Sequence, residues 1–457
     1  MSAQRVVVLG GGPAGDVAAL RAAQMGASVI MVEKENLGGT CLNWGCIPTK
    51  ALLATADLLR KIRRADEFGL VVPEVSFNFS KMMDRKTDIV GKLRGGVEAA
   101  CKRHKIEIVR TAGRIVDGSV EADGRSIPYD ILIVTTGTSV AGLPGLDMDH
   151  PSLMTSNDIL VLEEVPKRLL VIGGGVIGCE FASMFAALGS EITVVEMLPR
   201  LLAGIDNRTA TQFQRTLEKE GVTFHLGTKV SGMEYGETSV TATLENGTVI
   251  EADKVLVSIG RRANTRDIGL EAAGVVVDER GFIQVDEYLQ TANPKIYAAG
   301  DCIGGLQLAH LAEAEAHRAI ENAMNHGPRM AMDRTVVPSC IYTHPEIATV
   351  GLHADAAKEA GHEVKLGTAR FGGSGKALGE GEADGFVQLV ADKTTDELLG
   401  ATIMGAHAVE LIQEIGIALA DGLTMSELGS IIHAHPTVSE MVMHAAQQGE
   451  GVAAYLN

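Results

Sequence analysis

Two cysteines five positions apart carry the strongest chemical signal in the sequence. Cys41 and Cys46 lie within residues 38–50, which read GGTCLNWGCIPTK. On a regular helix, residues at this spacing are rotated by about 140° and separated by about 7.5 Å of rise, so their sulfurs would not meet. A disulfide needs α-carbons within about 7 Å. Because Asn43 and Gly45 are poor helix formers, we expect a distorted helix in which the pair forms a strained, easily reduced disulfide.

Two other interpretations of the pair remain open. The cysteines could bind a metal, but two thiolates need about two further ligands and the chain has no second close cysteine pair. They could also be inert buried thiols. We expect no metal site, and we expect the remaining four cysteines to be buried small hydrophobic residues: Cys101, Cys179, Cys302 and Cys340.

A histidine and a glutamate near the other end of the chain could supply acid-base chemistry. Residues 433–440 read HAHPTVSE, which places Glu440 five positions after His435. A carboxylate that orients the imidazole would stabilise its protonated form and raise its pKa toward the working range. A dithiol-disulfide centre needs such a base, since only the thiolate attacks. The alternative is a structural His-Pro pair that opens a helix.

Two charged residues in apolar surroundings are expected to pair with each other. Lys50 lies four positions after Cys46, and Glu180 lies within residues 176–182, which otherwise resemble a buried helix. Buried charges are usually paired. The pair would place a cation near the two sulfurs, where it could stabilise a reduced, negatively charged redox cofactor. The alternative is a surface lysine and a helix-end glutamate.

A repeated strand-turn-helix pattern predicts two nucleotide sites. In each copy an apolar strand meets a glycine-rich turn and a helix, and an acidic residue lies 23 positions after the first glycine. The glycines permit a tight turn and a close approach to a pyrophosphate at the helix N-terminus. The acids would accept hydrogen bonds from ribose, and a carboxylate in the second copy favours NAD over NADP. The copies comprise Val6–Leu9, Gly10–Gly15, a helix to Gly26 and Ser28–Glu33, then Leu169–Ile172, Gly173–Gly178, a helix to Gly189 and a strand to Glu196.

Further strands and helices complete the expected elements. Three apolar segments end at glycines where a ligand would lie, and the pattern changes from about Val336 to strands followed by helices. The stretch Phe371–Gly385 is rich in glycine and is expected to be a mobile loop. The expected strands are Ile131–Thr135, Lys254–Ile259, Lys295–Ala299, Val364–Phe371, Gly385–Ala391 and Leu398–Met404, and the expected helices are Ala408–Asp421 and Thr437–Gln447.

Length and composition bound the possible functions. The 457 residues suggest about three domains, and 46% hydrophobic residues can build a large core. A net charge of −18 argues against nucleic-acid binding. We expect no membrane span and no secretion signal, and the six cysteines are too few for a disulfide scaffold. A cytoplasmic location is therefore expected.

These motifs resemble the pyridine nucleotide-disulfide oxidoreductase family, class I, over essentially the whole chain. The resemblance rests on the two glycine turns, the cysteine segment, Ala299-Gly300-Asp301 and the closing His-Pro-Thr-x-Ser-Glu. It implies an α/β protein with two Rossmann-like domains, for FAD and NAD, and a C-terminal α+β dimerisation domain. The implied segments are 1–143 and 263–335 for FAD, 144–262 for NAD and 336–457 for the interface.

The resemblance also implies roles for individual residues. Cys41 would exchange with substrate, Cys46 would form a charge-transfer contact with the flavin, and His435, oriented by Glu440, would be the acid-base. Lys50 and Glu180 would complete the catalytic group. The implied FAD-binding residues are Gly10, Gly12, Gly15, Glu33, Lys50, Gly113, Thr136, Gly137, Thr138, Asp301, Gln307, Leu308, Ala309 and His310, and the implied NAD-binding residues are Gly173, Gly175, Gly178, Glu180, Glu196, Val230 and Gly260.

The activity implied is oxidation of protein-bound dihydrolipoyl groups to the lipoyl disulfide, with NAD as acceptor. The implied partners are a second copy, whose histidine completes the cysteine site, and a lipoyl-bearing carrier or acyltransferase core. Three alternatives stay open: a related NAD(P)H-dependent disulfide reductase, a mercuric reductase, and a flavoprotein assembly subunit with secondary catalysis. The glycine-rich 371–376 segment and Ala263, where a proline is common, depart from the family pattern.

Overall fold

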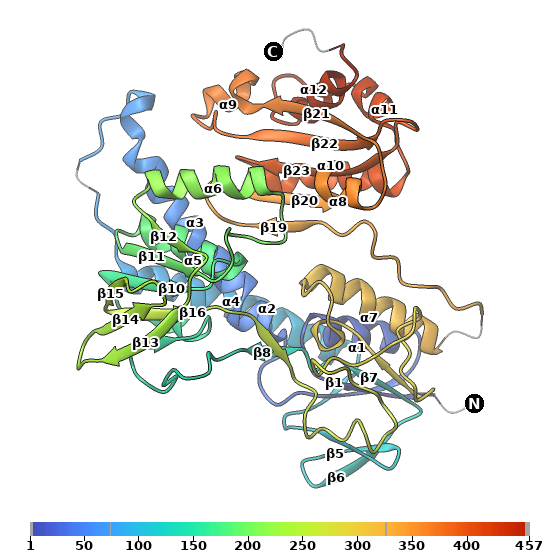
Figure 1. Cartoon of the computed structure of the whole chain (residues 1–457). Helices are drawn as coiled ribbons and strands as arrows, with labels where there is room; N and C mark the ends of the chain where they lie inside the picture. The colour runs from blue at the N-terminus through green and yellow to red at the C-terminus, as the bar shows by residue number, and fades with distance from the viewer. Residues whose placement is uncertain (1–2, 74, 325–326, 453–457) are drawn as a thin grey trace.

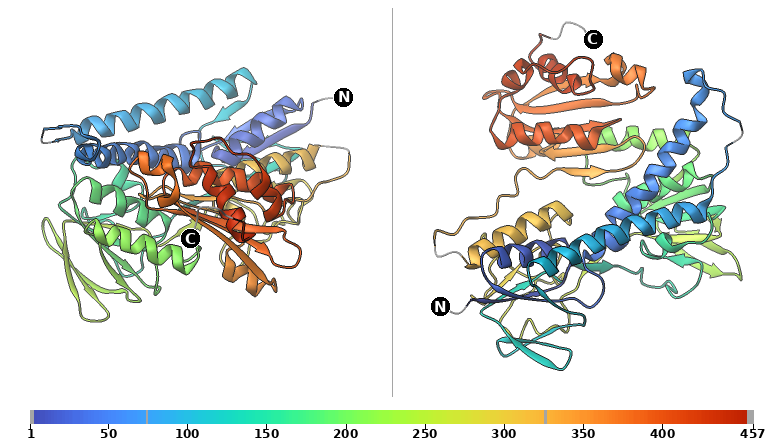
Figure 2. Two further views of the ribbon diagram at one scale, coloured as in Figure 1. Left: turned by 90° about the horizontal axis from the view of Figure 1, so that it is seen from above. Right: turned by 180° about the vertical axis from the view of Figure 1, so that it is seen from behind.

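The computed structural model describes residues 3–73, 75–324 and 327–452. It has three packed units, two built on parallel sheets and one on an antiparallel sheet (Figures 1 and 2). The C-terminal unit, orange to red in Figure 1, lies above the sheet that contains the N-terminal strand.

The first sheet combines strands from the two segments expected to form the FAD domain, residues 1–143 and 263–335. Its inner strand is fully buried at Val6, Val7 and Val8, as a parallel sheet covered on both faces requires. Helices α1 (Pro13–Gln24) and α7 (Ala309–Met324) pack against each other beside it. In sheet order the strands are β18 (Ile296–Ala298), β7 (Ile131–Val134), β1 (Arg5–Leu9), β2 (Ser28–Val32) and β3 (Glu107–Val109), all parallel.

The second sheet repeats this arrangement around the second glycine turn. Its central strand precedes α5 (Val176–Ala187), a helix buried on nearly every side. In sheet order the strands are β12 (Thr223–Leu226), β11 (Glu191–Glu196), β10 (Arg168–Ile172), β16 (Lys254–Val257) and β9 (Leu153–Met154), all parallel. Helix α6 (Asn207–Lys219) and the antiparallel β13 (Val230–Tyr235), β14 (Val240–Leu244) and β15 (Val249–Ala252) complete the unit.

The C-terminal unit is an antiparallel sheet covered by helices, with a hydrophobic core of its own. This confirms the expected α+β class for the third unit. Its sheet order is β19 (Ser339–Ile341), β20 (Ile347–Gly351), β23 (Leu398–Met404), β22 (Phe386–Asp392) and β21 (Val364–Arg370), and its helices are α8 (Ala354–Glu359), α10 (Ala408–Ala420), α11 (Met425–Ser430) and α12 (Glu440–Gly449).

Two structural connections bring the nucleotide units together. Helix α3 (Cys46–Arg63) packs against both α4 (Phe79–Arg103) and α5, because its buried leucines share one hydrophobic cluster with α5. The short strands β8 (Thr138–Val140) and β17 (Arg261–Ala263) also pair across the two units. Beside the first sheet, β4 (Arg114–Val116), β5 (Ser119–Ala122) and β6 (Arg125–Pro128) form a small antiparallel sheet.

The prediction of a mobile loop at 371–385 is wrong. The segment forms a 3-10 turn, Phe371–Gly373, and a short helix α9, Gly375–Gly379. The Phe371 ring is fully buried, and the Ser374 side chain caps α9 by accepting a hydrogen bond from the Ala377 backbone. Of the glycines in this segment, Gly385 packs directly against the Phe371 ring, whereas Gly375 and Gly379 border open space.

Several predicted element boundaries also need correction. The last predicted helix begins at Glu440 rather than at residue 437, and the strand predicted over 254–259 ends at Val257. In both places the residue pattern typical of the element extends beyond its regular hydrogen bonds, as often happens at the ends of helices and strands. Within the described part of the chain, no helix is both long and apolar enough to cross a membrane.

Candidate functional site

One large cavity of about 1650 Å³ runs along the edges of both parallel sheets and reaches the cysteine segment. Its volume exceeds the roughly 300–1,000 Å³ of a typical small-molecule pocket. Of the residues singled out from the sequence, it is lined by Gly10, Gly12, Glu33, Cys41, Cys46, Lys50, Gly113, Thr136, Gly137, Thr138, Gly173, Gly175, Glu180, Glu196, Val230, Gly260, Asp301, Gln307, Leu308, Ala309 and His310. Four others do not line it: Gly15, Gly178, His435 and Glu440.

The cysteine pair lies where two helices meet at an angle. Helix α2 (Gly39–Trp44) ends before Gly45, and α3 begins at Cys46. Gly45 has φ −143° and ψ −112°, far from helical values. A side chain there would come within 3.0 Å of the Thr40 carbonyl oxygen. The predicted distortion is therefore confirmed, and it brings Cys41 and Cys46 next to each other.

Both cysteines are free thiols in this structure, and their side chains share a hydrogen bond. That hydrogen bond from Cys41 lowers the pKa of Cys46 to about 7, against the opposing effect of burial and with further help from the Lys50 charge. The same contact and burial raise the pKa of Cys41. When the reduced pair loses one proton, the negative charge therefore lies mainly on Cys46.

The predicted pairing of Lys50 with Glu180 is confirmed. The Lys50 Nζ donates to both carboxylate oxygens of Glu180, at 2.9 and 2.8 Å. The Glu180 side chain is only 5% exposed, and the backbone N–H of Tyr342 donates to it at 3.0 Å. The same ammonium lies 4.4 Å from the centre of the Tyr342 ring. This buried ion pair fixes a cation one helical turn after Cys46.

The two glycine turns have nearly the same geometry. A Cβ on Gly15 would lie 1.9 Å from the Gly10 carbonyl oxygen, and a Cβ on Gly178 would lie 2.0 Å from the Gly173 carbonyl oxygen. The third glycine of each turn therefore permits close contact of helix with strand. This explains why neither residue reaches the cavity.

The acidic residue of each copy also occupies the same place. Glu33 accepts hydrogen bonds from the backbone N–H groups of Gly11, at 2.7 Å, and Glu35, at 2.7 Å. Glu196 accepts from Gly174, at 2.6 Å, and from Leu198, at 2.7 Å. Each carboxylate is thus held facing the cavity with remaining lone pairs available. This arrangement fits hydrogen bonding to ribose hydroxyls.

The cavity walls also fit two dinucleotides. The Thr136 hydroxyl is buried and has no hydrogen-bond partner among the described residues, and it lines the cavity. No side chain caps the N-terminus of α1 or of α5, which leaves backbone N–H groups for phosphate oxygens. A Cβ on Gly175 or Gly260 would meet nothing within 4 Å, so these glycines border open space.

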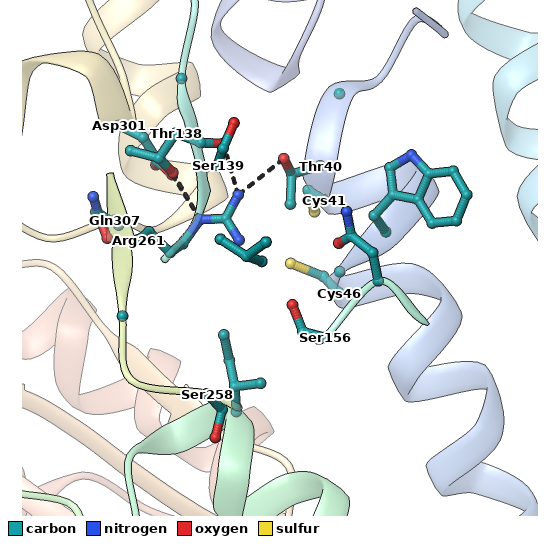
Figure 3. A pocket seen from close by; sticks show the side chains of 18 of the residues that line it. Thr40, Cys41, Cys46, Thr138, Ser139, Ser156, Ser258, Arg261, Asp301 and Gln307 are labelled. Carbon is teal, nitrogen blue, oxygen red and sulfur yellow. Dashed lines mark hydrogen bonds and ion pairs between the residues drawn. The ribbon is translucent and has the colours of Figure 1, made fainter. Parts of the chain in front are cut away.

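Arg261 also lines the cavity, although no motif in the sequence predicts a role for it. Its Nε donates to the Thr138 hydroxyl at 2.7 Å, and one terminal nitrogen donates to the Thr138 carbonyl at 2.8 Å and to the Thr40 hydroxyl at 3.2 Å. Figure 3 shows the guanidinium between Asp301 and Thr40, close to Cys46. Arg261 therefore connects β17 with β8 and with α2, beside the cysteines. In the sequence, Arg261 directly follows Gly260 at the end of an apolar segment, and that position could have marked it as a cavity residue.

Cys340 corrects another expectation. It is only partly buried and lines the cavity, whereas Cys101, Cys179 and Cys302 are fully buried as expected. Burial raises the pKa of Cys340 to about 11, so the thiol stays protonated near neutral pH. Among the described residues, no cluster of three or more histidine, cysteine, aspartate or glutamate side chains could hold a metal ion.

His435 and Glu440 form the predicted pair but lie away from the cavity. The His435 Nδ1 is 2.9 Å from a Glu440 carboxylate oxygen, and the imidazole is 82% exposed. Burial opposes the ionisation of Glu440, but hydrogen bonds from the Thr437 backbone and from His435 outweigh it and lower its pKa. The structure therefore contains a held but exposed imidazole on the C-terminal unit.

Comparison with family models gives two matches. The model described as pyridine nucleotide-disulphide oxidoreductase matches residues 4–316. The dimerisation-domain model of the same description matches residues 337–446.

Two similar proteins of known sequence are named dihydrolipoyl dehydrogenase. The chain is 44% identical over 468 residues to a dihydrolipoyl dehydrogenase of Bacillus subtilis, covering 98% of each protein. It is 42% identical over 448 residues to a dihydrolipoyl dehydrogenase of Chlamydia trachomatis, covering 96% of this chain and 95% of the other.

Solved structures show the same fold. LpdA from Mycobacterium tuberculosis superposes with a TM-score of 0.90 at 26% identity, covering 97% of this chain and 99% of that one. The HOCl-induced flavoprotein disulfide reductase RclA from Escherichia coli superposes with a TM-score of 0.88 at 28% identity, covering 96% and 98%.

Proposed function

Because the chain belongs to the pyridine nucleotide-disulfide oxidoreductase family, we propose that it oxidises protein-bound dihydrolipoyl groups to lipoyl disulfides and passes the electrons to NAD. It is an FAD- and NAD-dependent enzyme of this family. The observation that carries the proposal is the bend at Gly45, which places two thiols together in the cavity lined by both nucleotide turns. The dihydrolipoyl dehydrogenases of B. subtilis and C. trachomatis support the choice of substrate.

The two ends of the cavity are proposed to hold different nucleotides. FAD would be held by the first turn, Glu33, Thr136 and Asp301, within segments 1–143 and 263–335. NAD would be held by the second turn and Glu196, within segment 144–262. Residues 336–457, which include the C-terminal antiparallel sheet, would form the interface unit. The orphan Thr136 hydroxyl and the open surface at Gly175 support this assignment. When bound, the flavin accepts an electron pair from a thiolate and passes it as hydride to NAD.

The chain's own residues perform the thiol chemistry. In the oxidised enzyme Cys41 and Cys46 would be joined by a disulfide. A dihydrolipoyl thiolate attacks the Cys41 sulfur, which breaks that disulfide and releases Cys46 as a thiolate. The second dihydrolipoyl thiolate then attacks the substrate sulfur of the mixed disulfide and releases Cys41. Substrate loses two electrons and becomes the lipoyl disulfide, while the cysteine pair gains them.

The structure supports different tasks for the two cysteines. The hydrogen bond from Cys41 and the charge of Lys50 favour the thiolate on Cys46, which suits it to the charge-transfer contact with the flavin. Cys41 is left as the sulfur that exchanges with substrate. The Lys50–Glu180 ion pair keeps a cation near the electron-accepting end of this path.

The proton acceptor is proposed to come from a second subunit. His435 and Glu440 do not line the cavity of their own chain, although each substrate thiol must lose a proton before it attacks. The interface unit exposes large apolar side chains, among them Ile417 at 72% and Ile432 at 95%, and a large exposed apolar patch marks an interaction surface. We therefore propose a homodimer in which His435 of the partner subunit serves each cysteine pair.

The physiological partner is proposed to be a lipoyl-bearing carrier protein or an acyltransferase core. The names of the relatives support a dihydrolipoyl substrate. We also propose a cytoplasmic location, which the low cysteine content supports.

Turnover of free dihydrolipoamide with NAD tests the proposal. The flavin-loaded protein should reduce NAD when dihydrolipoamide is added, and both Cys41→Ser and Cys46→Ser should prevent it. A flavin-loaded dimer that leaves dihydrolipoamide unoxidised would contradict the proposal and favour an assembly role with secondary catalysis. Glutathione disulfide and mercuric ion, each with NADH or NADPH, serve as alternative substrates in the same assay.

A further inference from the structure

The segment that carries His435 has no helix or strand of its own. Residues 431–439 connect α11 to α12 without regular secondary structure. His435 is held by one contact, with Glu440, and its ring is otherwise exposed. The position of the imidazole therefore depends on what fixes the two ends of this segment, which we call the histidine loop.

A single carboxylate contacts both ends of the histidine loop. One oxygen of Glu414 pairs with Nε2 of His433, two residues before His435. Its other oxygen accepts a hydrogen bond from the Ser439 hydroxyl at 2.7 Å, one residue before Glu440. The side chain of His433 is only 5% exposed. Glu414 thus holds the entry and the exit of the loop.

The anchor itself belongs to a rigid element. Glu414 lies on α10, whose Ile412 and Ile415 are fully buried in the core of the interface unit. His433 is fixed from its other side as well, because its Nδ1 lies 2.9 Å from the Ile431 carbonyl oxygen. A ring with a hydrogen on each nitrogen satisfies both acceptors. The hydrogen bonds therefore connect the loop to the packed core.

We infer that Glu414 and His433 form a second carboxylate-histidine pair that positions the acid-base His435. The inference rests on the proposed function, since it assigns a partner to the acid-base of that reaction. Glu414 and His433 are positioning residues, because they touch the loop and not the reacting atoms. Without them, the side-chain hydrogen bonds left within the described loop are local ones, such as that from the Thr437 hydroxyl to the Ala434 carbonyl, 2.7 Å, while Val438 still packs in the core of the interface unit.

Loss of the Glu414 contacts should slow proton transfer from the substrate thiols and leave hydride transfer from NADH unchanged. A displacement of about 1 Å at a reacting group can cost on the order of 10²-fold in rate. We expect Glu414→Ala to slow reduction of the oxidised enzyme by dihydrolipoamide by about 10- to 100-fold. Reduction of the flavin by NADH, followed anaerobically by stopped flow, should be unchanged because it needs no proton acceptor for a thiol.

Conservative and control variants separate positioning from folding. Glu414→Gln should recover part of the rate, because its amide oxygen still accepts from Ser439. His433→Gln should slow the same step, and it serves as the second variant if Glu414→Ala yields no folded, flavin-loaded dimer. Glu359→Ala is the matched control: Glu359 is an exposed glutamate of the same unit, on α8, without a hydrogen bond or ion pair to described residues.

Three results would overturn the inference. The first is a dihydrolipoamide step of wild-type speed in folded Glu414→Ala or His433→Gln protein. The second is equal slowing of the NADH step, which would indicate a general structural role. The third is equal slowing by Glu359→Ala. A wild-type enzyme that leaves dihydrolipoamide unoxidised would instead contradict the proposed function itself, so the two failures are distinguishable.

Discussion

The cysteine half and the histidine half of the proposed reaction centre are built in different ways. Cys41 and Cys46 lie in a cavity whose supports, Lys50 and Glu180 among them, come from the same chain. His435 is 82% exposed on the interface unit and does not line the cavity of its own chain. In the proposed function, one chain therefore assembles what electron transfer needs, while proton transfer depends on a group that it would present to a second subunit.

The largest expected effect is on the cysteine half. Cys46→Ser should abolish NAD reduction by dihydrolipoamide and also remove the long-wavelength absorbance of the two-electron-reduced enzyme, because the charge-transfer donor is lost. Cys41→Ser is the matched variant: turnover should vanish, but the band should persist because Cys46 remains. Absorbance spectra during anaerobic titration measure this, and a band that survives Cys46→Ser would refute the division of tasks.

The next largest effect is on the histidine half. His435→Gln should lower the rate of reduction by dihydrolipoamide by about 10²- to 10⁴-fold, the usual contribution of general acid-base catalysis. Reduction by NADH should stay at the wild-type rate, since the cysteine cavity is intact. Stopped-flow traces of the two half-reactions check both statements. Equal losses in both would show that the two halves are not separable.

A substitution in the second glycine turn should weaken NAD binding and leave both the cysteine half and the histidine half of the reaction centre intact. Gly178→Ala places a Cβ 2.0 Å from the Gly173 carbonyl oxygen, and overpacking of this kind costs about 1–3 kcal/mol. We expect the KM for NAD to rise by about 5- to 150-fold, with normal formation of the long-wavelength band by dihydrolipoamide. Steady-state kinetics and titration measure the two. A lost band would mean that the nucleotide turn also supports the cysteines.

The smallest effect concerns the pH dependence of the cysteine half. The pKa of Cys46 is lowered to about 7 by the hydrogen bond from Cys41 and, against burial, by Lys50. Because the thiolate is the reactive form, alkylation of the reduced enzyme by iodoacetamide should accelerate as pH rises through about 7 and then level off. Lys50→Met should move this midpoint upward by about one pH unit, and Lys50→Arg should move it less. A midpoint unchanged by Lys50→Met would show that Lys50 does not lower the pKa of Cys46.

The sequence predicted the cysteine half more fully than the histidine half. Spacing and helix geometry were enough to require a break near Gly45, and the scarcity of buried charge was enough to pair Lys50 with Glu180. The first inference needed only residues close together in the chain, and the second needed only the general free-energy cost of burying an unpaired charge. The contacts of the histidine loop join residues 19 and 25 positions apart, and the sequence pattern of α10 did not single out Glu414.

Other failures have similar physical causes. Glycine content suggested mobility at 371–385, but tertiary packing around the Phe371 ring decides that segment. Arg261 follows a strand-end glycine, yet its bonds to Thr40 and Thr138 depend on how two sheets meet. Cys340 lacks a local partner, and its place at the cavity wall depends on the interface unit folding back onto the first two.

Mixing two inactive variants tests the shared centre most directly. Cys41→Ser and His435→Gln subunits, carrying different affinity tags, are dissociated, reassociated and purified as the doubly tagged heterodimer. If each cysteine pair uses the imidazole of the other subunit, one centre of the heterodimer has both wild-type groups, and about half of wild-type turnover should return. A folded, flavin-loaded heterodimer as inactive as its parents would place the working histidine within the same chain and contradict the account.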